Sequence, residues 1–234
     1  KLYAQQSYVV RSPIIQQSFM KHLSEISALL KKPGEPSPRC YISYAWPSLG
    51  NKDKEYWVQP FLYILCEHLK AAGIDIVMDV RDSRAGASIY GFMDQYNDGN
   101  YIIAIGTPSF RQKHLDTTAA AVQTELNIAL KRNDEDKKLG RGGRIYPLLI
   151  SGIIESSFPD GYCMYRNIQD GREGGEVRYI ESIEKLVAWL HRNKLNNNQD
   201  LKLKKAYVNK WRAFYELYRS QGGLTNSANS VVIE

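Results

Sequence analysis

The chain has 234 residues, enough for one well-buried α/β domain with additional helices, and its 43% hydrophobic and 24% charged content excludes wholesale disorder. Its apolar runs fall short of the roughly 20 residues of a membrane span, and the sequence does not open with a signal-peptide pattern. The net charge of +6 is concentrated in one C-terminal segment, so it does not indicate a nucleic-acid-binding surface. Because the first residue is Lys1 rather than Met, we expect a fragment or a processed chain.

The segment before Arg39 predicts a helix followed by a linker. Ser12 is a suitable N-cap and Pro13 suits the first helical position, so we expect a helix over residues 13–32. Residues 32–38 contain three prolines, which neither a helix nor a strand accommodates, and we interpret them as a linker. The apolar stripe of the helix consists of Phe19, Leu23, Ile26 and Leu30.

Short apolar runs of high β propensity alternate with helical patterns after Arg39. Such runs are typical of strands buried on both faces, and strands that alternate with helices require right-handed crossovers and a parallel sheet. The predicted fold is therefore α/β, a flavodoxin-like parallel sheet of about five strands with helices on both faces, plus flanking N- and C-terminal helices. The expected strands are Cys40–Tyr44, Ile74–Asp79, Tyr101–Gly106, Ile145–Ile150 (near an edge because of its proline) and a short Tyr162–Tyr165.

Apolar positions at helical spacing predict further helices between and after the strands. The helix Ala119–Arg132 is followed by a charged segment, Asn133–Lys138. The glycine-rich stretch 140–144 precedes a strand and lacks the Lys-Ser/Thr of a P-loop, so we interpret it as a flexible connector. The other expected helices are Trp57–Leu69, ended by Gly73, one around Ala87–Asn97, and one with apolar positions from Ile180 to Leu190.

The segment Leu201–Ser220 predicts a final helix that is both basic and aromatic. Six Lys or Arg residues against Glu216 account for most of the excess positive charge of the chain. Because the preceding connector is short and the N-terminal helix offers a matching apolar stripe, we expect these two helices to pack together rather than to contact an anionic membrane. The aromatic stripe, which is too apolar to remain in water, consists of Tyr207, Trp211, Phe214, Leu217 and Tyr218.

The cysteines and histidines do not indicate a metal site. Cys40, Cys66 and Cys163 lie in apolar stretches, which favours reduced core thiols in a cytosolic protein. Cys66 and His68 are two residues apart on an expected helix and would point to different faces. The four histidines are otherwise scattered along the chain, so we expect no bound metal.

Several candidate site residues follow the carboxyl ends of the expected strands, where α/β proteins bind ligands. They would give one cleft an aromatic platform, a polar loop and a single carboxylate, that of Glu125. An alternative interpretation is that Glu125 is a solvated surface residue. For Tyr44 the alternative is that its ring caps the core. The candidates are Tyr44, Ala45 and Trp46 after the first strand, Asp79 and the turn Arg81–Gly86 after the second, and Thr107–Ser109, which lead from the third strand toward Glu125.

These segments resemble the conserved boxes of Toll/interleukin-1 receptor (TIR) domains. Residues 41–44, YISY, are similar to the first box, and residues 79–86, DVRDSRAG, are similar to the second box, called the BB loop. Glu125 falls on the third helix, where NAD-cleaving TIR domains carry their catalytic glutamate. The resemblance covers roughly Arg39–Arg192, which sets the expected domains at 1–38 (helix and linker), 39–192 (TIR-like) and 193–234 (basic, aromatic helix and tail).

Two positions depart from the pattern of NAD-cleaving members. Ala121 stands four residues before Glu125, where those members often have Trp. Ala45 and Trp46 follow the tyrosine of the first box, where basic residues are common, and Trp46 is a candidate to take over base stacking.

The resemblance implies cleavage of the nicotinamide–ribose bond of NAD⁺, with NAD⁺ as substrate and no other cofactor. Nicotinamide is a cationic leaving group, so the reaction chiefly needs an anion beside the oxocarbenium-like ribose, a role for Glu125. The resemblance also implies substrate-binding roles for Tyr44, Ala45, Trp46, Asp79, Arg81, Arg84 and Gly86. Tyr44 or Trp46 would stack on a base and Arg81 and Arg84 would contact phosphates, whereas Asp79 has the alternative of anchoring the loop.

The expected function is therefore that of a TIR-type NAD⁺ glycohydrolase, which releases nicotinamide and ADP-ribose or a cyclic variant, in immune, defence or effector signalling in the cytoplasm. The alternative is a non-catalytic TIR interaction module, an adaptor or decoy that acts through homotypic contacts. A nucleoside-processing transferase is disfavoured because a second paired carboxylate is lacking. The expected partners are NAD⁺ and other TIR domains, including copies of this chain.

Overall fold

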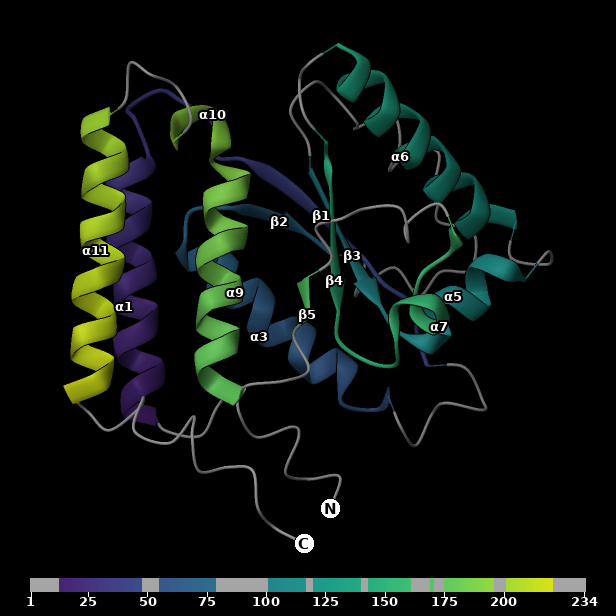
Figure 1. The fold of residues 1–234 in the computed structure, drawn as a ribbon, viewed down its shortest axis with the longest axis horizontal. Coiled ribbons are helices and arrows are strands. Elements are labelled where there is room, and N and C mark those ends of the chain that lie inside the picture. The colour runs from purple at the N-terminus through teal and green to yellow at the C-terminus, as the bar shows by residue number, and fades with distance from the viewer. Residues whose placement is uncertain are drawn as a thin grey trace, which may run out of the picture. The chain divides into compact units, whose positions relative to one another are not determined.

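The computed structural model describes residues 13–47, 55–78, 101–116, 120–139, 143–160, 169–170, 175–195 and 201–220 (Figure 1). The elements group into two compact units by their contacts. Unit 1 takes in the chain up to Pro38, Pro60–Asp75 and the chain from Glu173 onward, whereas unit 2 comprises Arg39–Gln59 and Ile76–Arg172. The domain limits expected from the sequence stay a prediction.

The described strands form one sheet in the order β2-β1-β3-β4-β5 (Figure 1). The pairs β1–β3, β3–β4 and β4–β5 are parallel, with Cys40 opposite Tyr101 and Ile102 opposite Ile145. The chain is thus α/β with a parallel sheet flanked by helices, compatible with a flavodoxin-like fold, as the alternation of strands and helices predicts. The strands are β1 (Arg39–Ser43), β2 (Asp75–Val77), β3 (Tyr101–Gly106), β4 (Ile145–Leu149) and β5 (Gln169–Asp170).

The strand predictions hold best where burial is complete. All six residues of β3 and all five of β4 are buried, and both lie where their apolar runs predict them. Pro147, which lacks an N–H, is accommodated one strand in from β5, at the end of the described sheet. The expected fifth strand, Tyr162–Tyr165, lies outside the described residues, and the strand that is found at this end is β5.

The helices of unit 2 are α5 (Pro108–Leu115), α6 (Ala120–Lys138) and α7 (Ile154–Ser157). Phe110 of α5 and Phe158, directly after α7, meet edge to face with 6.2 Å between ring centroids. A Cβ on Gly106 would overlap the Phe158 ring, which explains why β3 ends in glycine. The core of this unit consists of Ala45, Ile102, Ala104, Phe110, Ile145, Leu149 and Phe158.

Two features of these helices correct the sequence analysis. Helix α5 was not expected, because its sequence PSFRQKHL is mostly polar and lacks an apolar stripe. Helix α6 does not end at Arg132 but runs through Asn133–Lys138, which was expected to be a separate charged segment. The continuation is explained by Asn133 and Asp136, which are buried one helical turn apart rather than solvated. The helix expected around Ala87–Asn97 lies outside the described residues.

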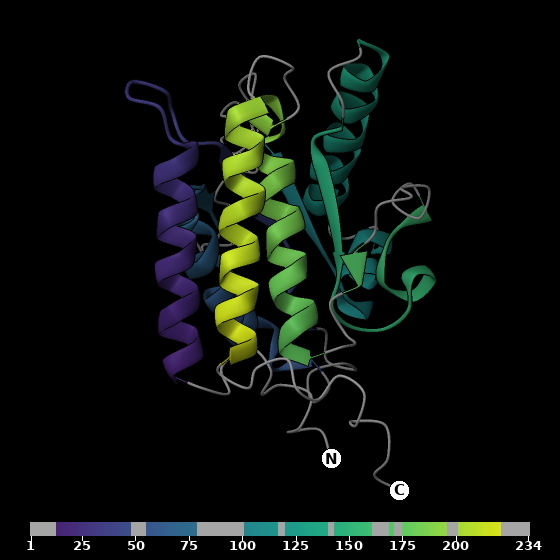
Figure 2. The same ribbon diagram turned by 60° about the vertical axis from the view of Figure 1, so that its left-hand side comes forward.

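Unit 1 is a bundle in which α1 and α11 lie side by side (Figures 1 and 2). Phe19 and His22 of α1 meet Trp211 of α11 at centroid distances of 6.5 and 4.4 Å, and Trp211 is only 1% exposed. The expectation that the two terminal helices pack together is confirmed. The helices are α1 (Pro13–Leu30), α3 (Val58–Ala71, mostly in this unit), α9 (Gly175–Leu190), α10 (Arg192–Leu195) and α11 (Leu201–Ser220).

Local sequence signals in these helices also hold. Pro13 begins α1, and Gly73 follows α3 with a φ of 80°, a conformation that favours glycine. Cys40 and Cys66 are buried and reduced, as expected, and burial raises the pKa of Cys66 to about 11. Cys163 and Ser12 lie outside the described residues.

Two histidines are buried in the bundle of unit 1. His68 shares a hydrogen bond of 2.7 Å between its Nδ1 and the Tyr179 Oη, and its ring lies 5.0 Å from that of Phe19. His22 stacks on Phe214 at 4.4 Å, and the charges of Glu25 and Lys210 act on its pKa in opposite directions. Burial lowers the pKa of both histidines from the ordinary 6.5 to about 4, so both are neutral in the folded bundle.

We predict that acid destabilises unit 1 through these histidines. Because their pKa is lower in the folded than in the unfolded state, their stabilisation is complete above pH 6.5 and is lost as the pH falls toward 4. His22→Phe keeps an aromatic ring but cannot be protonated, so it should reduce the loss of unfolding free energy between pH 7.5 and 4.5 by about 2 kcal/mol. Urea unfolding followed by circular dichroism measures this, and identical pH profiles for wild type and variant would contradict it.

Candidate functional site

The sheet order identifies one end of unit 2 as the place to look for a site. Along the chain, β1 is followed by β2 on one side of it, and β3 lies on its other side. The direction of the connections therefore reverses between β1 and β3. In open parallel sheets, ligands bind outside the carboxyl ends of the strands at such a reversal.

Aromatic side chains follow β1 at this point. Trp46 is 49% exposed and Tyr44 is half-buried, and their ring centroids lie 6.4 Å apart with a tilt of 45°. Ala45 between them is 5% exposed and belongs to the core, so its methyl group points inward. Of the three residues predicted here, the aromatic pair leaves ring surface accessible, which suits stacking on a planar ligand.

The residues after β3 are fixed by helix capping. Thr107 is the N-cap of α5, and its Oγ1 accepts a hydrogen bond of 3.1 Å from the Phe110 N–H. The backbone N–H of Ser109, in the first turn of α5, donates to the Glu55 Oε1 at 3.3 Å. The start of α5 therefore presents a hydroxyl and a carboxylate beside the end of β3.

Glu55 is the residue that the sequence analysis missed. It is 1% exposed, and its second oxygen, Oε2, is buried without a hydrogen-bond partner among the described residues. Nothing in the sequence signals this, because the contact with Ser109 joins residues 54 positions apart. Glu55 sits between a polar loop and an apolar helix, where a solvated glutamate is the ordinary expectation.

The ends of β3 and β4 are tied together by backbone hydrogen bonds. The Gly106 carbonyl accepts from the N–H groups of Ile150 and Ser151 at 3.1 and 3.3 Å. The Ser157 Oγ donates to the Ser151 carbonyl at 2.6 Å, which anchors α7 to the same turn. The carboxyl ends of β3 and β4 are thus held by paired backbone groups.

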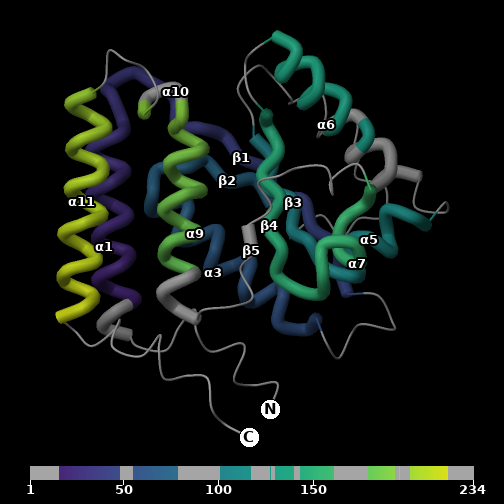
Figure 3. The backbone as a smooth tube through the Cα atoms, in the orientation of Figure 1, coloured from purple at the N-terminus to yellow at the C-terminus, as the bar shows by residue number. Residues whose placement is uncertain are grey.

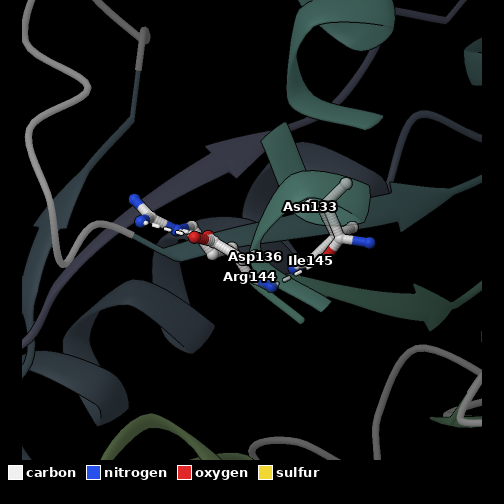
Figure 4. Close-up of polar contacts among 4 residues, drawn as sticks. All are labelled: Asn133, Asp136, Arg144 and Ile145. Carbon is white, nitrogen blue, oxygen red and sulfur yellow. Dashed lines mark hydrogen bonds and ion pairs between the residues drawn. The ribbon is translucent and has the colours of Figure 1, made fainter. Parts of the chain in front are cut away.

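The far end of α6 is clasped to the beginning of β4 (Figure 4). The Asn133 Oδ1 accepts from the backbone N–H groups of Arg144 and Ile145 at 2.7 and 3.4 Å. The Arg144 guanidinium forms a two-pronged ion pair with Asp136, through Nε and through Nη2, the latter at 3.2 Å from Oδ1. Both side chains are largely buried, a setting in which such pairs are strong and directional.

This clasp, formed by Asn133, Asp136 and Arg144, fixes the direction of α6. It therefore also fixes how far along the sheet the Glu125 backbone lies. Helix α6 follows α5, the helix that leaves the carboxyl end of β3, and ends near the amino end of β4, a path that Figure 3 traces. Glu125 precedes Asn133 by eight residues, about 12 Å along a helix, which is close to the roughly 13 Å length of a five-residue strand. The Glu125 backbone is thereby brought toward the carboxyl edge of the sheet, whereas its side chain is not among those described.

The other predicted site residues are Asp79, Arg81, Arg84 and Gly86. They lie outside the described residues, so their roles stay predictions. In the structure, Tyr44 and Trp46 follow β1, the start of α5 follows β3, and Glu55 joins the start of α5 through its contact with Ser109.

The comparisons with known proteins leave the site to be judged on its own geometry. No family model matches the chain, and no curated protein matches it. Across the described ranges, no three or more His, Cys, Asp or Glu side chains gather as a metal site would require. None of the helices in these ranges combines the length and the hydropathy needed to cross a bilayer.

We predict that the clasp contributes substantially to the stability of unit 2. Asp136→Asn leaves the buried Arg144 guanidinium without its carboxylate and should lower the free energy of unfolding by about 3 kcal/mol. The matched control is Asp134→Asn on the same helix, because Asp134 is exposed and 3.9 Å from Lys137, a pair worth less than about 0.5 kcal/mol. Urea unfolding measures both, and equal effects of the two variants would show that the clasp is not a stabilising feature.

Proposed function

We propose that this chain is a TIR-type NAD⁺ glycohydrolase with Glu125 as its catalytic carboxylate. The observation that carries the proposal is the course of α6, which brings Glu125 toward the sheet edge where Tyr44 and Trp46 follow β1. The strand order adds support, because the ends of β1 and β3 flank the point at which parallel sheets of this order bind nucleotides. The resemblance of residues 41–44 and 79–86 to the TIR boxes supplies the identity of the substrate.

The proposed reaction breaks the bond between the ribose C1′ and the nicotinamide nitrogen. The bonding electrons leave with nicotinamide, which departs as a neutral ring, and positive charge develops on the ribose. The Glu125 carboxylate stabilises this oxocarbenium-like ribose electrostatically. Water then forms the new C–O bond and releases a proton, which gives ADP-ribose; capture by an atom of the same nucleotide gives a cyclic product instead.

The remaining groups bind the substrate. Tyr44 or Trp46 stacks on a base of NAD⁺, since stacking needs only an exposed aromatic face. Arg81 and Arg84 contact the phosphates through charge-assisted hydrogen bonds, and Asp79 and Gly86 shape the BB loop that carries them. We place the activity in cytoplasmic immune, defence or effector signalling, with assembly through contacts between TIR-type domains.

We predict that Glu125→Gln abolishes NAD⁺ cleavage without unfolding the protein. Removal of the anion should lower the turnover number at least roughly 100-fold, because the developing positive charge loses its stabilising partner. The matched control is Glu135→Gln, an exposed residue farther along α6, which should retain wild-type turnover. Nicotinamide release is measured by chromatography and folding by circular dichroism.

Retained turnover in Glu125→Gln would remove Glu125 from the mechanism. A wild-type chain that self-associates but leaves NAD⁺ intact would favour the alternative, a non-catalytic TIR interaction module.

A further inference from the structure

We propose that Glu55 is a substrate-binding residue whose Oε2 accepts a hydrogen bond from a hydroxyl or amide group of the bound nucleotide. The inference rests on the proposed function for the nature of the ligand. Its own basis is the buried, half-paired carboxylate at the start of α5, beside the end of β3.

The two oxygens of Glu55 are in different situations. Oε1 accepts the Ser109 N–H at 3.3 Å, whereas Oε2 is buried with no hydrogen-bond partner among the described residues. Buried polar atoms in folded proteins are nearly always paired, and a carboxylate that is 1% exposed has little water to compensate for a missing donor. We therefore expect a ligand to supply the hydrogen-bond donor for the buried Oε2 of Glu55.

A purely structural capping role does not account for Glu55. Helix α5 already has an N-cap, because the Thr107 Oγ1 accepts the Phe110 N–H and Pro108 follows it without needing a partner for an N–H. A hydroxyl or an amide at residue 55 would serve the remaining Ser109 N–H without burying a charge. Capping of α5 therefore does not explain why residue 55 carries a charged carboxylate rather than a neutral acceptor.

The chemistry around Glu55 favours a neutral donor over a cation. The N-terminus of α5 already directs partial positive charge at the carboxylate through the Ser109 N–H. In the part of the chain that the structure describes, no further carboxylates or imidazoles join Glu55 in a group suited to a metal ion. The fitting ligand groups are the ribose hydroxyls and the carboxamide or adenine amino groups, all of which NAD⁺ carries.

The position of Glu55 agrees with this role. Ser109 follows β3 by three residues, and Tyr44 and Trp46 follow β1, so both segments lie at the edge where the connections reverse. A nucleotide that stacks on the aromatic pair would present its sugar or amide groups to neighbouring acceptors at this edge.

The test compares Glu55→Gln with Trp211→Phe, a change in the aromatic core of unit 1. A glutamine keeps one acceptor for the Ser109 N–H but places an NH₂ donor where the substrate donor binds. We expect Glu55→Gln to keep the wild-type melting temperature and to raise the KM for NAD⁺ about 10-fold, with a smaller change in kcat. Trp211→Phe removes part of a buried ring between α1 and α11 and should lower the melting temperature while leaving KM unchanged.

A second measurement separates the sources of the donor and stands apart from catalysis. Titration calorimetry of the wild type and of Glu55→Gln with 5′-AMP and with nicotinamide mononucleotide tests the two halves of NAD⁺ individually. We expect the variant to lose affinity for the half whose hydroxyl or amide group Glu55 holds. If Glu55→Gln fails to fold, Glu55→Asp keeps the charge with a shorter reach and should show the same rise in KM.

The two proposals fail in different ways. Wild-type cleavage of NAD⁺ with an unchanged KM in Glu55→Gln would overturn the role of Glu55 and leave the proposed function intact. Binding of a mononucleotide without any cleavage, with affinity lost in Glu55→Gln, would contradict the proposed function and support Glu55. Equal affinities in wild type and variant, or no binding of either mononucleotide, would overturn the inference about Glu55.

Discussion

The candidate site depends on the clasp between α6 and the start of β4. The Asn133 Oδ1 accepts hydrogen bonds from the backbone N–H groups of Arg144 and Ile145 at the start of β4. Asp136 forms an ion pair with the guanidinium of Arg144. One end of a long helix is thereby pinned to the amino edge of the sheet, so its other end is carried to the carboxyl edge. The position of the Glu125 backbone relative to the sheet therefore depends on an interaction at the opposite end of its helix. An ion pair outside the candidate site thus helps to position the turn of α6 that contains Glu125.

The sequence predicted those parts of the fold whose signal is local. Strands β3 and β4 are buried on both faces, which leaves continuous apolar runs that can be recognised without knowledge of their neighbours. Pro13 and Gly73 mark helix ends for reasons of backbone conformation alone. The packing of α1 against α11 could also be predicted, because each helix has an apolar stripe that must be buried.

The sequence did not predict features that arise from contacts between distant residues. Helix α5 depends on the Thr107 cap and on burial of Phe110 rather than on an apolar stripe. The polar sequence of the last turns of α6 predicts exposure to solvent. Asn133 and Asp136 are buried instead, because both contact Arg144, which lies beyond the helix. Glu55 is the extreme case, because its environment is created by a helix that was itself not expected. For the candidate site, the aromatic pair was recognisable from the sequence, Glu125 stays a prediction, and the structure added the carboxylate of Glu55.

The central claim is that this edge of the sheet holds NAD⁺ and that the chain cleaves it. Incubation of the wild-type chain with NAD⁺ over a range of protein concentrations, followed by chromatography of the products, tests it most directly. The account predicts release of nicotinamide together with ADP-ribose or a cyclic form, at a rate per protomer that rises with protein concentration as copies assemble. Intact NAD⁺ at concentrations where sedimentation shows self-association would contradict it.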